Sequence, residues 1–457
     1  MSIVSYSGES EELKNSILNF FSKFQISGVL KTCNGYKQKG IQPIQIFRYK
    51  FSNIFQPMSM YMQQRTGAYK EDFAKNTFYR FINDARINWT RFSNTIAKKA
   101  IDLIKPLTDD TRINAFIIDD SIFERTSVRH TELGAKVFDH CDMRYKKGYR
   151  MMTCGWTDGS TFIPTGHTLL SSHQEKNVLG FERKFDSRTL AGKRRVRAKL
   201  KGTDAMLELI KDAQHAGISA DYVLFDTWFS SPAQLTAIKG LGLDSIAMVK
   251  NSSRIYYLYN GQKLSLKKIY GMNKKRRGRS KYLLSVDVLV GSEKQIPAKI
   301  VFVRNNRRKK DWIAFIATNT EISEEEIIRI YGKRWQIEVF FKTCKCHLNL
   351  IGECHSLSYD ALTAHVSIVF ARYILLAFEQ RKSQDSRTLG EIFFFMYAEL
   401  ADITFAEAMS VMVKAMFETI STVLNVTNEQ MDLFVDVFIS KLPEYLQRAL
   451  ALSASAA

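Results

Sequence analysis

The sequence lacks an apolar run long enough to cross a lipid bilayer. Its nearest candidate, residues 361–378, is interrupted by His365 and Arg372, whereas a spanning helix needs about 20 predominantly apolar residues. The amino-terminal segment carries three glutamates by position 12, which is unlike the apolar core of a secretory signal. We therefore expect a cytoplasmic protein that has no membrane partner.

Cysteine is also scarce, with 6 residues in a chain of 457. The cysteines have no regular spacing, which favours reduced cytosolic thiols over a disulfide framework. Cys344, Cys346, His347, Cys354 and His355 lie near one another in the sequence but contain no paired C-x-x-C of the kind that zinc sites use. We expect buried thiols and a histidine at a helix end there, rather than zinc.

Acidic residues are too few to balance the basic ones. The chain has 66 Lys and Arg against 46 Asp and Glu, a formal net charge of +20. An excess of this size favours a polyanionic partner, and double-stranded DNA is the leading candidate. Since 45% of the residues are hydrophobic and 25% are charged, the composition is otherwise that of a globular protein with a sizeable core.

The first 110 residues contain helical patterns and no succession of strand-like segments. The pattern of residues 73–85 fits a short helix, a turn and a second helix, with Thr77 as an N-cap and Arg80 pointing outward. Residues 87–101 continue as an amphipathic helix. This part of the chain is therefore predicted to be a helical DNA-binding region.

Short apolar segments that end in acids follow this helical region. Residues 113–118 predict a buried strand that ends at Asp119 and Asp120, and a second short strand ends at Asp226. Between them, two more strand-like segments flank the turn signal Asp158–Gly159. This order predicts an α/β fold, a ribonuclease H-like mixed sheet flanked by helices.

Changes in composition divide the sequence into five regions. Short alternating runs with basic clusters predict a β-strand insertion within the core, and the end of the chain is again helical. The predicted regions are 1–110 (helical, DNA-binding), 111–250 (catalytic core, first part), 251–310 (β insertion), 311–352 (catalytic core, second part, with the Glu338 helix) and 353–457 (helical, for dimerisation).

A polar stripe lies along one predicted helix, residues 322–349, in which nothing breaks the helical pattern decisively. At about 100° per residue, Tyr331, Arg334, Glu338 and Lys345 fall within about 60° of one another. One carboxylate among two cations and a phenol suits a metal ion and phosphates. Ion pairs on an exposed helix face give the same pattern, so both interpretations stay open.

Three carboxylates thus stand at the ends of elements around one predicted sheet: Asp120, Asp226 and Glu338. Asp119 is an alternative to Asp120, and only one of the two should bind metal because neighbouring strand residues face opposite ways. Carboxylate oxygens suit Mg²⁺, for which Mn²⁺ can substitute. Two such ions at one site promote phosphodiester cleavage.

The spacing of the stripe resembles the YREK signature of bacterial insertion-sequence transposases with a DDE triad. The signature residues are Tyr331, Arg334, Glu338 and Lys345. The segments around Asp120 and Asp226 look like the first and second acid motifs of that family. The family motif has a Ser after its first acid, so Ser121 is the reason to prefer Asp120 to Asp119.

The resemblance covers about residues 113–350 and includes two further segments, 139–150 and 155–164. It implies a bacterial, nucleoid-associated enzyme that performs cut-and-paste transposition. Such an enzyme binds the transposon end repeats, cleaves the DNA through a hairpin intermediate and joins the ends to target DNA. The metal ligands implied by position, for two Mg²⁺ ions, are Asp120, Asp226 and Glu338.

The resemblance also implies DNA contacts. Arg334 and Lys345 would hold phosphates near the transposon end together with Tyr331. Trp312 would stack a flipped base, or else it is a core or interface tryptophan. The basic span 183–201 is expected to be a solvated surface that lies along a phosphate backbone. The predicted DNA-binding residues are Tyr331, Arg334, Lys345, Trp312, Arg80, Lys274, Arg276, Arg307 and Arg308.

Two other functions remain open from the sequence: a metal-dependent nuclease without strand transfer, and a catalytically silent, transposase-derived regulator. Transposition requires two ends to be cut together, so a homodimer is expected. Ile368, Tyr373, Leu376 and residues 393–396 are apolar enough to supply its surface. The alternative is that they close the core of their own helical region.

Overall fold

The computed structural model describes residues 17–55, 59–67, 69–108, 112–139, 142–276, 280, 282–292, 294–305, 311–381, 430 and 437. Met1–Ser386 forms one compact unit and Arg387–Ala457 a second. Every helix and strand named below belongs to the first unit. Residues 307, 308 and 393–396, for which the sequence predicted functions, lie outside the described residues.

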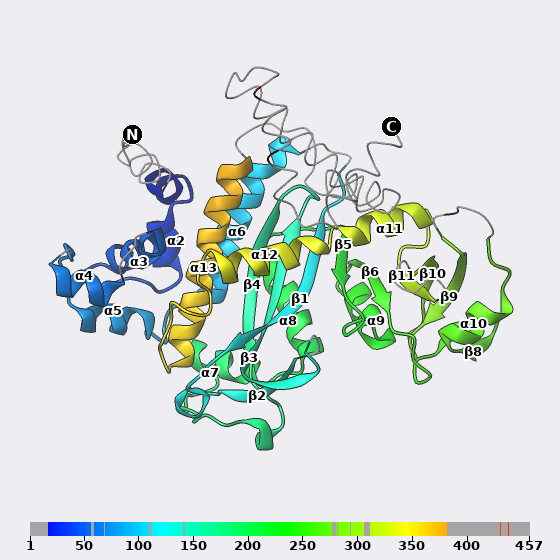
Figure 1. Ribbon diagram of the computed structural model, residues 1–457, viewed down its shortest axis with the longest axis horizontal. Coiled ribbons are helices and arrows are strands. Elements are labelled where there is room, and N and C mark those ends of the chain that lie inside the picture. Colours follow the sequence, from blue (N-terminus) through cyan, green and yellow to red (C-terminus); the bar gives the residue numbers. More distant parts are fainter. Residues whose placement is uncertain are drawn as a thin grey trace. The chain divides into compact units, whose positions relative to one another are not determined.

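The amino-terminal part consists of helices that lie close together (Figure 1), and aromatic side chains pack between them. Phe47 stacks on Phe51 and Trp89, and all three are fully buried. The helices are α2 (Ile26–Thr32), α3 (Pro43–Ser52), α4 (Met60–Thr66), α5 (Lys75–Ile82) and α6 (Trp89–Ile104). Helix α6 confirms the predicted amphipathic helix. The N-cap of α5 is Ala74, so Thr77 lies inside that helix and its prediction as an N-cap was wrong.

The described strands form one mixed sheet of 11 strands in the order β2-β3-β1-β5-β6-β11-β10-β9-β7-β8, with β4 paired to β3. The β1–β5 and β5–β6 pairs are parallel and the others are antiparallel. The strands are β1 (Ala115–Glu124), β2 (Ala135–Asp139), β3 (Arg144–Thr157), β4 (Phe162–Leu170), β5 (Tyr222–Phe225), β6 (Asp244–Val249), β7 (Tyr257–Tyr259), β8 (Gln262–Leu264), β9 (Leu284–Val290), β10 (Ile296–Arg304) and β11 (Trp312–Ala317).

Helices flank this sheet, which confirms the predicted mixed α/β architecture. They are α7 (Leu190–Ala198), α8 (Gly202–His215), α9 (Pro232–Gly240), α10 (Leu266–Met272), α11 (Glu324–Gly332), α12 (Trp335–Cys346) and α13 (Tyr359–Arg381). Short 3₁₀ turns occupy Asn53–Phe55, Lys105–Leu107, Val128–His130 and Glu175–Asn177. The segment predicted as an insertion, 251–310, continues the main sheet, because β10 pairs with β11.

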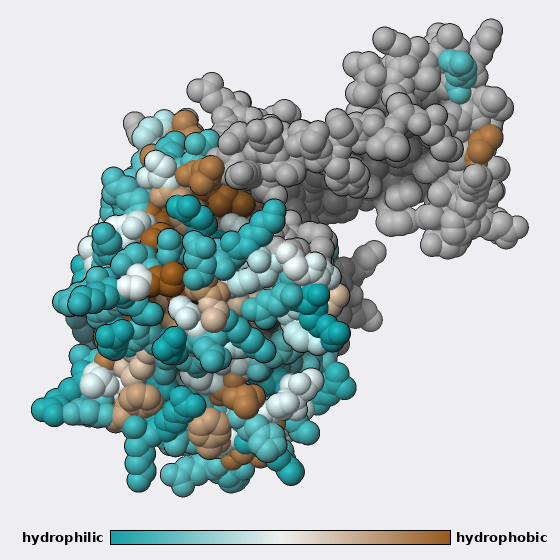
Figure 2. Space-filling view, turned by 90° about the vertical axis from the view of Figure 1, so that its left-hand side faces the viewer, coloured by the Kyte–Doolittle hydropathy of each residue, from teal (hydrophilic) through white to brown (hydrophobic). Residues whose placement is uncertain are grey.

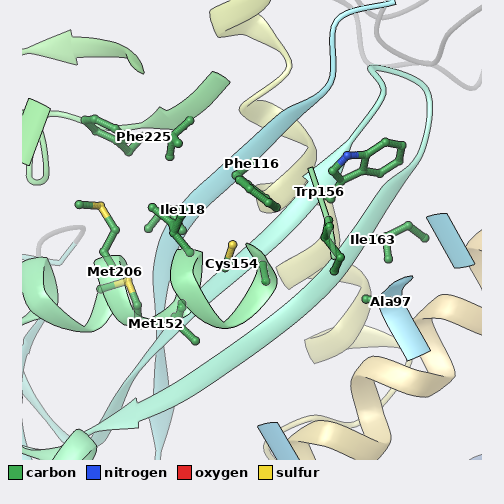
Figure 3. Close-up of a cluster of buried hydrophobic side chains, with 14 of the residues drawn as sticks. Ala97, Phe116, Ile118, Met152, Cys154, Trp156, Ile163, Met206 and Phe225 are labelled. Atoms are coloured by element: carbon green, nitrogen blue, oxygen red, sulfur yellow. The ribbon is translucent and has the colours of Figure 1, made fainter. Parts of the chain in front are cut away.

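Alternate residues of β1 enter two separate cores on the two faces of the sheet. Phe116 and Ile118 pack in the core that contains α8 and α9, and Figure 3 shows them with Cys154 of β3 and Met206 of α8. Ala115 and the next alternate residue, Ile117, pack in the core that contains α11 and α12. This alternation decides which face of the sheet each acid of β1 occupies.

Helix α13 joins the amino-terminal helices to the sheet, and it lies beside α6 in Figure 1. The span Tyr359–Phe378 is long and apolar enough to cross a membrane, but 89% of the apolar window is buried inside the structure, as in a core helix. Arg372 is fully buried in it. Its guanidinium donates to Glu353 at 2.6 and 3.0 Å and to the carbonyls of Phe51 (2.9 Å) and Lys50. This arginine therefore ties α3 to α13.

The structure corrects three expectations. The helix predicted over 322–349 is two helices, because a turn at Lys333 and Arg334 separates α11 from α12. Strand β1 continues past the two acids to Glu124, so the acids lie within the strand rather than at its end.

The third correction concerns the expected dimer surface. Ile368 is fully buried, and Tyr373 packs against Phe340 and Phe162 inside the chain's own core. Leu376 packs against the same core. The face turned to the viewer in Figure 2 is mostly hydrophilic, with scattered apolar groups. The described residues of α13 thus close a core rather than a dimer interface.

Candidate active site

Three acids from distant parts of the sequence meet near one arginine. Arg334, in the turn between α11 and α12, donates from Nη1 to Asp119 Oδ2 at 2.8 Å and from Nη2 to Glu338 Oε1 at 2.5 Å. The guanidinium therefore bridges the middle of β1 and the first turn of α12. Glu338 lies four residues after Arg334, so the helical repeat places the two on one side.

Asp226 belongs to the same place because of the register of two parallel strands. In the β1–β5 pair, Ile117 lies beside Leu224. Two residues further along each strand direction, Asp119 is level with Asp226. The backbone N–H of Trp228 donates to Asp226 Oδ1 at 2.9 Å and fixes the carboxylate in the turn after β5. The prediction of a short strand ending at Asp226 is confirmed.

Asp120 occupies the opposite face of the sheet from Glu338. Its carboxylate accepts two hydrogen bonds from Arg150 of β3, at 2.9 Å from Nε and 2.5 Å from Nη2. Asp119 follows Ala115 and Ile117 on the face covered by α12, whereas Asp120 follows Phe116 and Ile118. The placement therefore favours Asp119 over Asp120 as the partner of Glu338, and the identity of the first metal ligand stays a prediction.

The carboxylates perturb one another. Burial raises the pKa of Asp119 to about 7, and the charges of Asp120 and Asp226 add to the rise while Arg334 opposes it. Burial also raises the pKa of Asp226, against the hydrogen bond from Trp228 and the charge of Arg334. Carboxylates in this state bind a cation favourably, because a nearby positive charge offsets their desolvation and mutual repulsion.

A divalent metal ion fits the donor chemistry of the site. Asp119, Asp226 and Glu338 offer the carboxylate oxygens that Mg²⁺ prefers, and a cation already bridges two of them. Among the residues that the structure describes, no three His, Cys, Asp or Glu side chains are arranged to hold a metal ion as they stand. Arg334 would have to release its carboxylates before all three acids could share an ion.

The other two residues of the predicted YREK signature lie in different environments. Tyr331 of α11 is buried against Phe315 of β11, and its hydroxyl lies near Arg334 without a hydrogen bond of normal geometry. Lys345 is exposed on α12. The structure thus groups Arg334 and Glu338 with the acids of the sheet, places Lys345 at the surface and places Tyr331 in the core.

The remaining predicted DNA contacts are spread over several elements. Trp312 is half-buried and stacks on Tyr270, with ring centroids 5.1 Å apart. Lys274 and Arg276 are exposed near α10, and the Arg276 guanidinium lies 4.2 Å from the ring centroid of Tyr282. Arg80 is exposed on α5. None of these four predicted residues contacts the three acids in the structure. Arg307 and Arg308 lie outside the described residues.

Sequence reasoning missed two residues that contact the acids. Arg150 holds Asp120, and Trp228 is 46% exposed two residues after Asp226. Lys250 lies over the Trp228 ring at 4.7 Å. The segment 139–150, which carries the resemblance to the transposase family, ends at Arg150 and was the available signal. Trp335, next to Arg334, is exposed as well.

The cysteines in and after α12 differ in exposure. Cys344 and Cys354 are buried, and burial raises the pKa of both thiols. Cys346 is exposed. A protonated, buried thiol is a poor metal ligand and a poor nucleophile.

Comparison with known proteins gives one family. The sequence profile described as "DDE superfamily endonuclease" matches residues 55–285, half of the chain. The matched segment contains Asp119, Asp120 and Asp226 and ends before α11 and α12, so Glu338 is placed by the structure and by its spacing. A search of curated proteins found no match.

Proposed function

Because the chain belongs to the DDE superfamily endonucleases, we propose that it is a DNA transposase that cleaves transposon ends and joins them to target DNA. Membership makes it a nuclease-type enzyme that acts on DNA and depends on divalent metal ions. The proposal adds strand transfer, a hairpin intermediate and the YREK subfamily. The observation that carries it is the meeting of Asp119, Asp226 and Glu338 around Arg334.

Each residue of the site has a proposed task. Asp119, Asp226 and Glu338 would hold Mg²⁺, which when bound neutralises phosphate charge and activates an attacking oxygen. Arg334 would exchange its two carboxylates for a DNA phosphate, to which its planar guanidinium donates in a forked geometry. Lys345, exposed in the last turn of α12, would contact the DNA backbone as a point charge.

Cleavage of DNA that flanks the gene tests the acid assignment. Asp226→Asn and Glu338→Gln should each abolish cleavage and leave DNA binding unchanged, because each removes an anionic ligand and little volume. Two exposed acids outside the site provide matched controls, Asp287→Asn and Glu321→Gln, and both should cleave normally. Normal cleavage by the Asp226 variant would contradict the assignment.

Products distinguish transposition from simple cleavage. A transposase gives hairpin ends and joins them to a supercoiled plasmid, whereas an endonuclease of the same family stops at cut ends. Binding without any cleavage would indicate a silent regulator, against which the presence of all three acids argues. Cut ends without joining would refute the transposase and keep the endonuclease.

We further propose that two chains act together at the nucleoid, since both ends of an element must be cut and joined. The contact surface would involve residues other than the buried ones of α13. Light scattering with and without end DNA measures the stoichiometry. One chain per complex that never pairs two ends would refute the dimer.

A further inference from the structure

Strand β3, which pairs with the acid-bearing strand β1, extends beyond the core as part of a β ribbon. Strand β1 ends at Glu124, opposite Gly148 of β3. From Gly148 back to Arg144, β3 pairs with β2 through five residue pairs, and among the described strands only β2 pairs with residues 144–147. Figure 1 shows β2 below α12. We call residues 135–139 and 144–147 the β2–β3 ribbon.

The alternation of side chains along a strand gives this ribbon two different faces. Tyr145 lies opposite Phe138, and Lys147 lies opposite Lys136. The side chains of directly opposite residues project from the same side of a sheet, so these four residues share one face, which we call the lysine face. The ring centroids of Tyr145 and Phe138 are 5.3 Å apart.

The opposite face of the ribbon has its positive charge neutralised within the chain. The ammonium of Lys146 lies 2.7 Å from carboxylate oxygens of both Asp139 and Asp142. It also lies 3.3 Å from Glu124. The Arg144 guanidinium reaches Asp142 at 3.3 Å. The cations of this face are therefore already engaged by carboxylates.

The charge of the lysine face is not neutralised in this way. Lys136 and Lys147 are both exposed, and neither ammonium makes a hydrogen bond or an ion pair with a described residue. Like charges directly opposite each other destabilise a sheet, and an anion bound between them would offset this cost. Tyr145, on the same face, is 62% exposed. Two available lysines beside an exposed tyrosine suit the phosphates and sugars of a nucleic acid.

The lysine face is continuous with the face of the sheet on which Asp119 lies. Asp119 pairs with Thr153 of β3, and every second residue from Thr153 back along β3 leads through Met151 and Tyr149 to Lys147. Met151 and Tyr149 belong to the core that contains α11 and α12, which agrees with this alternation. DNA that reaches the acids can therefore pass over the ribbon on the same side of the sheet.

The basic span 183–201 offers fewer available cations than its composition indicated. Arg195 is buried and donates to both carboxylate oxygens of Glu132 at 2.8 and 3.0 Å and to Asp360 at 2.8 Å. Arg194 donates to Asp360 as well. The expectation that the whole span is a solvated surface was therefore wrong for these two arginines.

We propose that the lysine face of the β2–β3 ribbon binds the backbone of the DNA duplex that enters the acidic site. Lys136 and Lys147 contact phosphates as point charges, and Tyr145 donates its hydroxyl to a phosphate or sugar oxygen. The inference rests on the proposed function, because it takes DNA at the three acids as its starting point.

Strand geometry gives the position of this contact on the DNA. Lys147 is six residues from Thr153, the partner of Asp119, which is about 20 Å at about 3.4 Å per residue. One strand of B-DNA also advances by about 3.4 Å per nucleotide. The contact is therefore expected about six base pairs from the cleaved phosphate.

A double variant, Lys136→Gln with Lys147→Gln, removes the available charge of the lysine face. The matched control, Lys263→Gln with Lys294→Gln, removes the same charge from exposed lysines near β8 and β9, at the other end of the strand order from β2. The unfolding midpoint should not fall in either variant, because all four side chains are exposed. Binding of duplex DNA is measured in a chelator at several salt concentrations.

The ribbon variant should lower the log–log slope of affinity against salt by about 1.8, because each of two lost phosphate contacts contributes about 0.9. The control should keep the slope of the parent chain. Tyr145→Ala should weaken binding about fivefold and leave the slope unchanged, because it removes one neutral hydrogen bond. In hydroxyl-radical footprints of a DNA end, the ribbon variant should lose protection about six base pairs from the cut, and the control should keep it.

Three results would overturn the proposal. The first is an equal slope for the parent chain and the ribbon variant. The second is an equal fall in slope for the ribbon variant and the control, which would indicate a general effect of net charge. The third is unchanged protection of the DNA by the ribbon variant. The salt slope requires neither cleavage nor joining, so a slope change in a chain that cleaves nothing would keep the DNA contact and refute the transposase.

Discussion

The two neighbouring acids of β1 should respond to the same substitution in opposite ways. Asp119 shares Arg334 with Glu338, whereas Asp120 pairs with Arg150 on the other face of the sheet. Asp119→Asn is therefore expected to abolish cleavage and, without metal, to raise stability. Asp120→Asn is expected to lose stability and keep cleavage.

The cost at position 120 follows from its paired geometry. Arg150 makes two hydrogen bonds to the Asp120 carboxylate, and the two side chains are only 23% and 13% exposed. An asparagine leaves a half-buried guanidinium without its anion and keeps one acceptor. Breaking a fully buried pair costs roughly 3–5 kcal/mol, so we expect Asp120→Asn to lower the free energy of unfolding by about 2 kcal/mol.

At position 119 the expected change in the free energy of unfolding has the opposite sign. The pKa of Asp119 is about 7 in the folded chain and about 3.9 in an unfolded one. The folded chain thus holds a proton that the unfolded chain releases, and its stability falls as the pH rises from 4 to 7. Full burial would make this loss about 4 kcal/mol. Because the side chain is 17% exposed, a gain of about 2 kcal/mol is expected for Asp119→Asn at pH 7.5 without metal.

Urea unfolding at pH 7.5 in a chelator and cleavage of gene-flanking DNA with Mg²⁺ measure the two effects. Added Mg²⁺ should raise the unfolding midpoint of the parent chain and of Asp120→Asn, but not that of Asp119→Asn. Normal cleavage by Asp119→Asn together with no cleavage by a folded Asp120→Asn would refute the reasoning from strand alternation. The sequence-based preference for Asp120 would then hold.

Three further predictions concern stability and DNA binding. Burial lowers the pKa of His365 to about 3. Below pH 6.5 the imidazole therefore becomes protonated in the unfolded chain but stays neutral in the folded chain. Unfolding between pH 8 and 5 should show a loss of about 2 kcal/mol from this group, absent in His365→Gln, and equal pH profiles would refute this. Arg372→Met removes the buried donor of Glu353 and of two backbone carbonyls. It should lower the free energy of unfolding, measured with denaturant, by about 3–5 kcal/mol. Lys50→Met should lower the free energy of unfolding by less, because Glu353 still pairs with Arg372. Equal losses in the two variants would refute this order. DNA affinity should fall with salt at a log–log slope of about 0.9 per neutralised phosphate, and a slope near zero would assign the excess positive charge to another partner.

Local patterns predicted most of the elements that carry the acids. The hairpin at Asp158–Gly159 forms because Gly159 takes a positive φ of 95° and the Asp158 carboxylate accepts from the N–H groups of Ser160 and Thr161, both at 2.8 Å. The prediction of strand β5 and of the acid that follows it likewise depended only on neighbouring residues. These features depend on a few consecutive residues, so they are visible without the fold.

The face of each β1 acid had no such signal. Residues 115–118 are apolar at every position and buried on both faces, as in strands covered on both sides. A pattern without alternation cannot tell which of Asp119 and Asp120 points toward α12. Only the register with β5 and the positions of α8 and α12 separate them, and both are tertiary features.

The break between α11 and α12 has a tertiary cause too. Lys333 and Arg334 keep right-handed helical dihedral angles, so local preference predicts a continuous helix. Lys333 is buried, and its ammonium donates to the Ile113 carbonyl at 2.6 Å and approaches that of Asp158 at 3.4 Å. Ile113 precedes β1, and Asp158 lies in the turn that follows β3.

One turn therefore connects the hairpin of the sheet to the candidate site. Lys333 fixes it against the start of β1 and the β3–β4 hairpin, and the next residue, Arg334, reaches Asp119 and Glu338. In an unbroken helix, the side chains of Lys333 and Arg334 would point about 100° apart around one helix axis. With the turn pinned by Lys333, Arg334 lies at the start of α12, four residues before Glu338. The contact of Arg334 with Asp119 of the sheet thus depends on the place of a turn that a buried lysine fixes, although Lys333 itself contacts neither Asp119 nor Glu338.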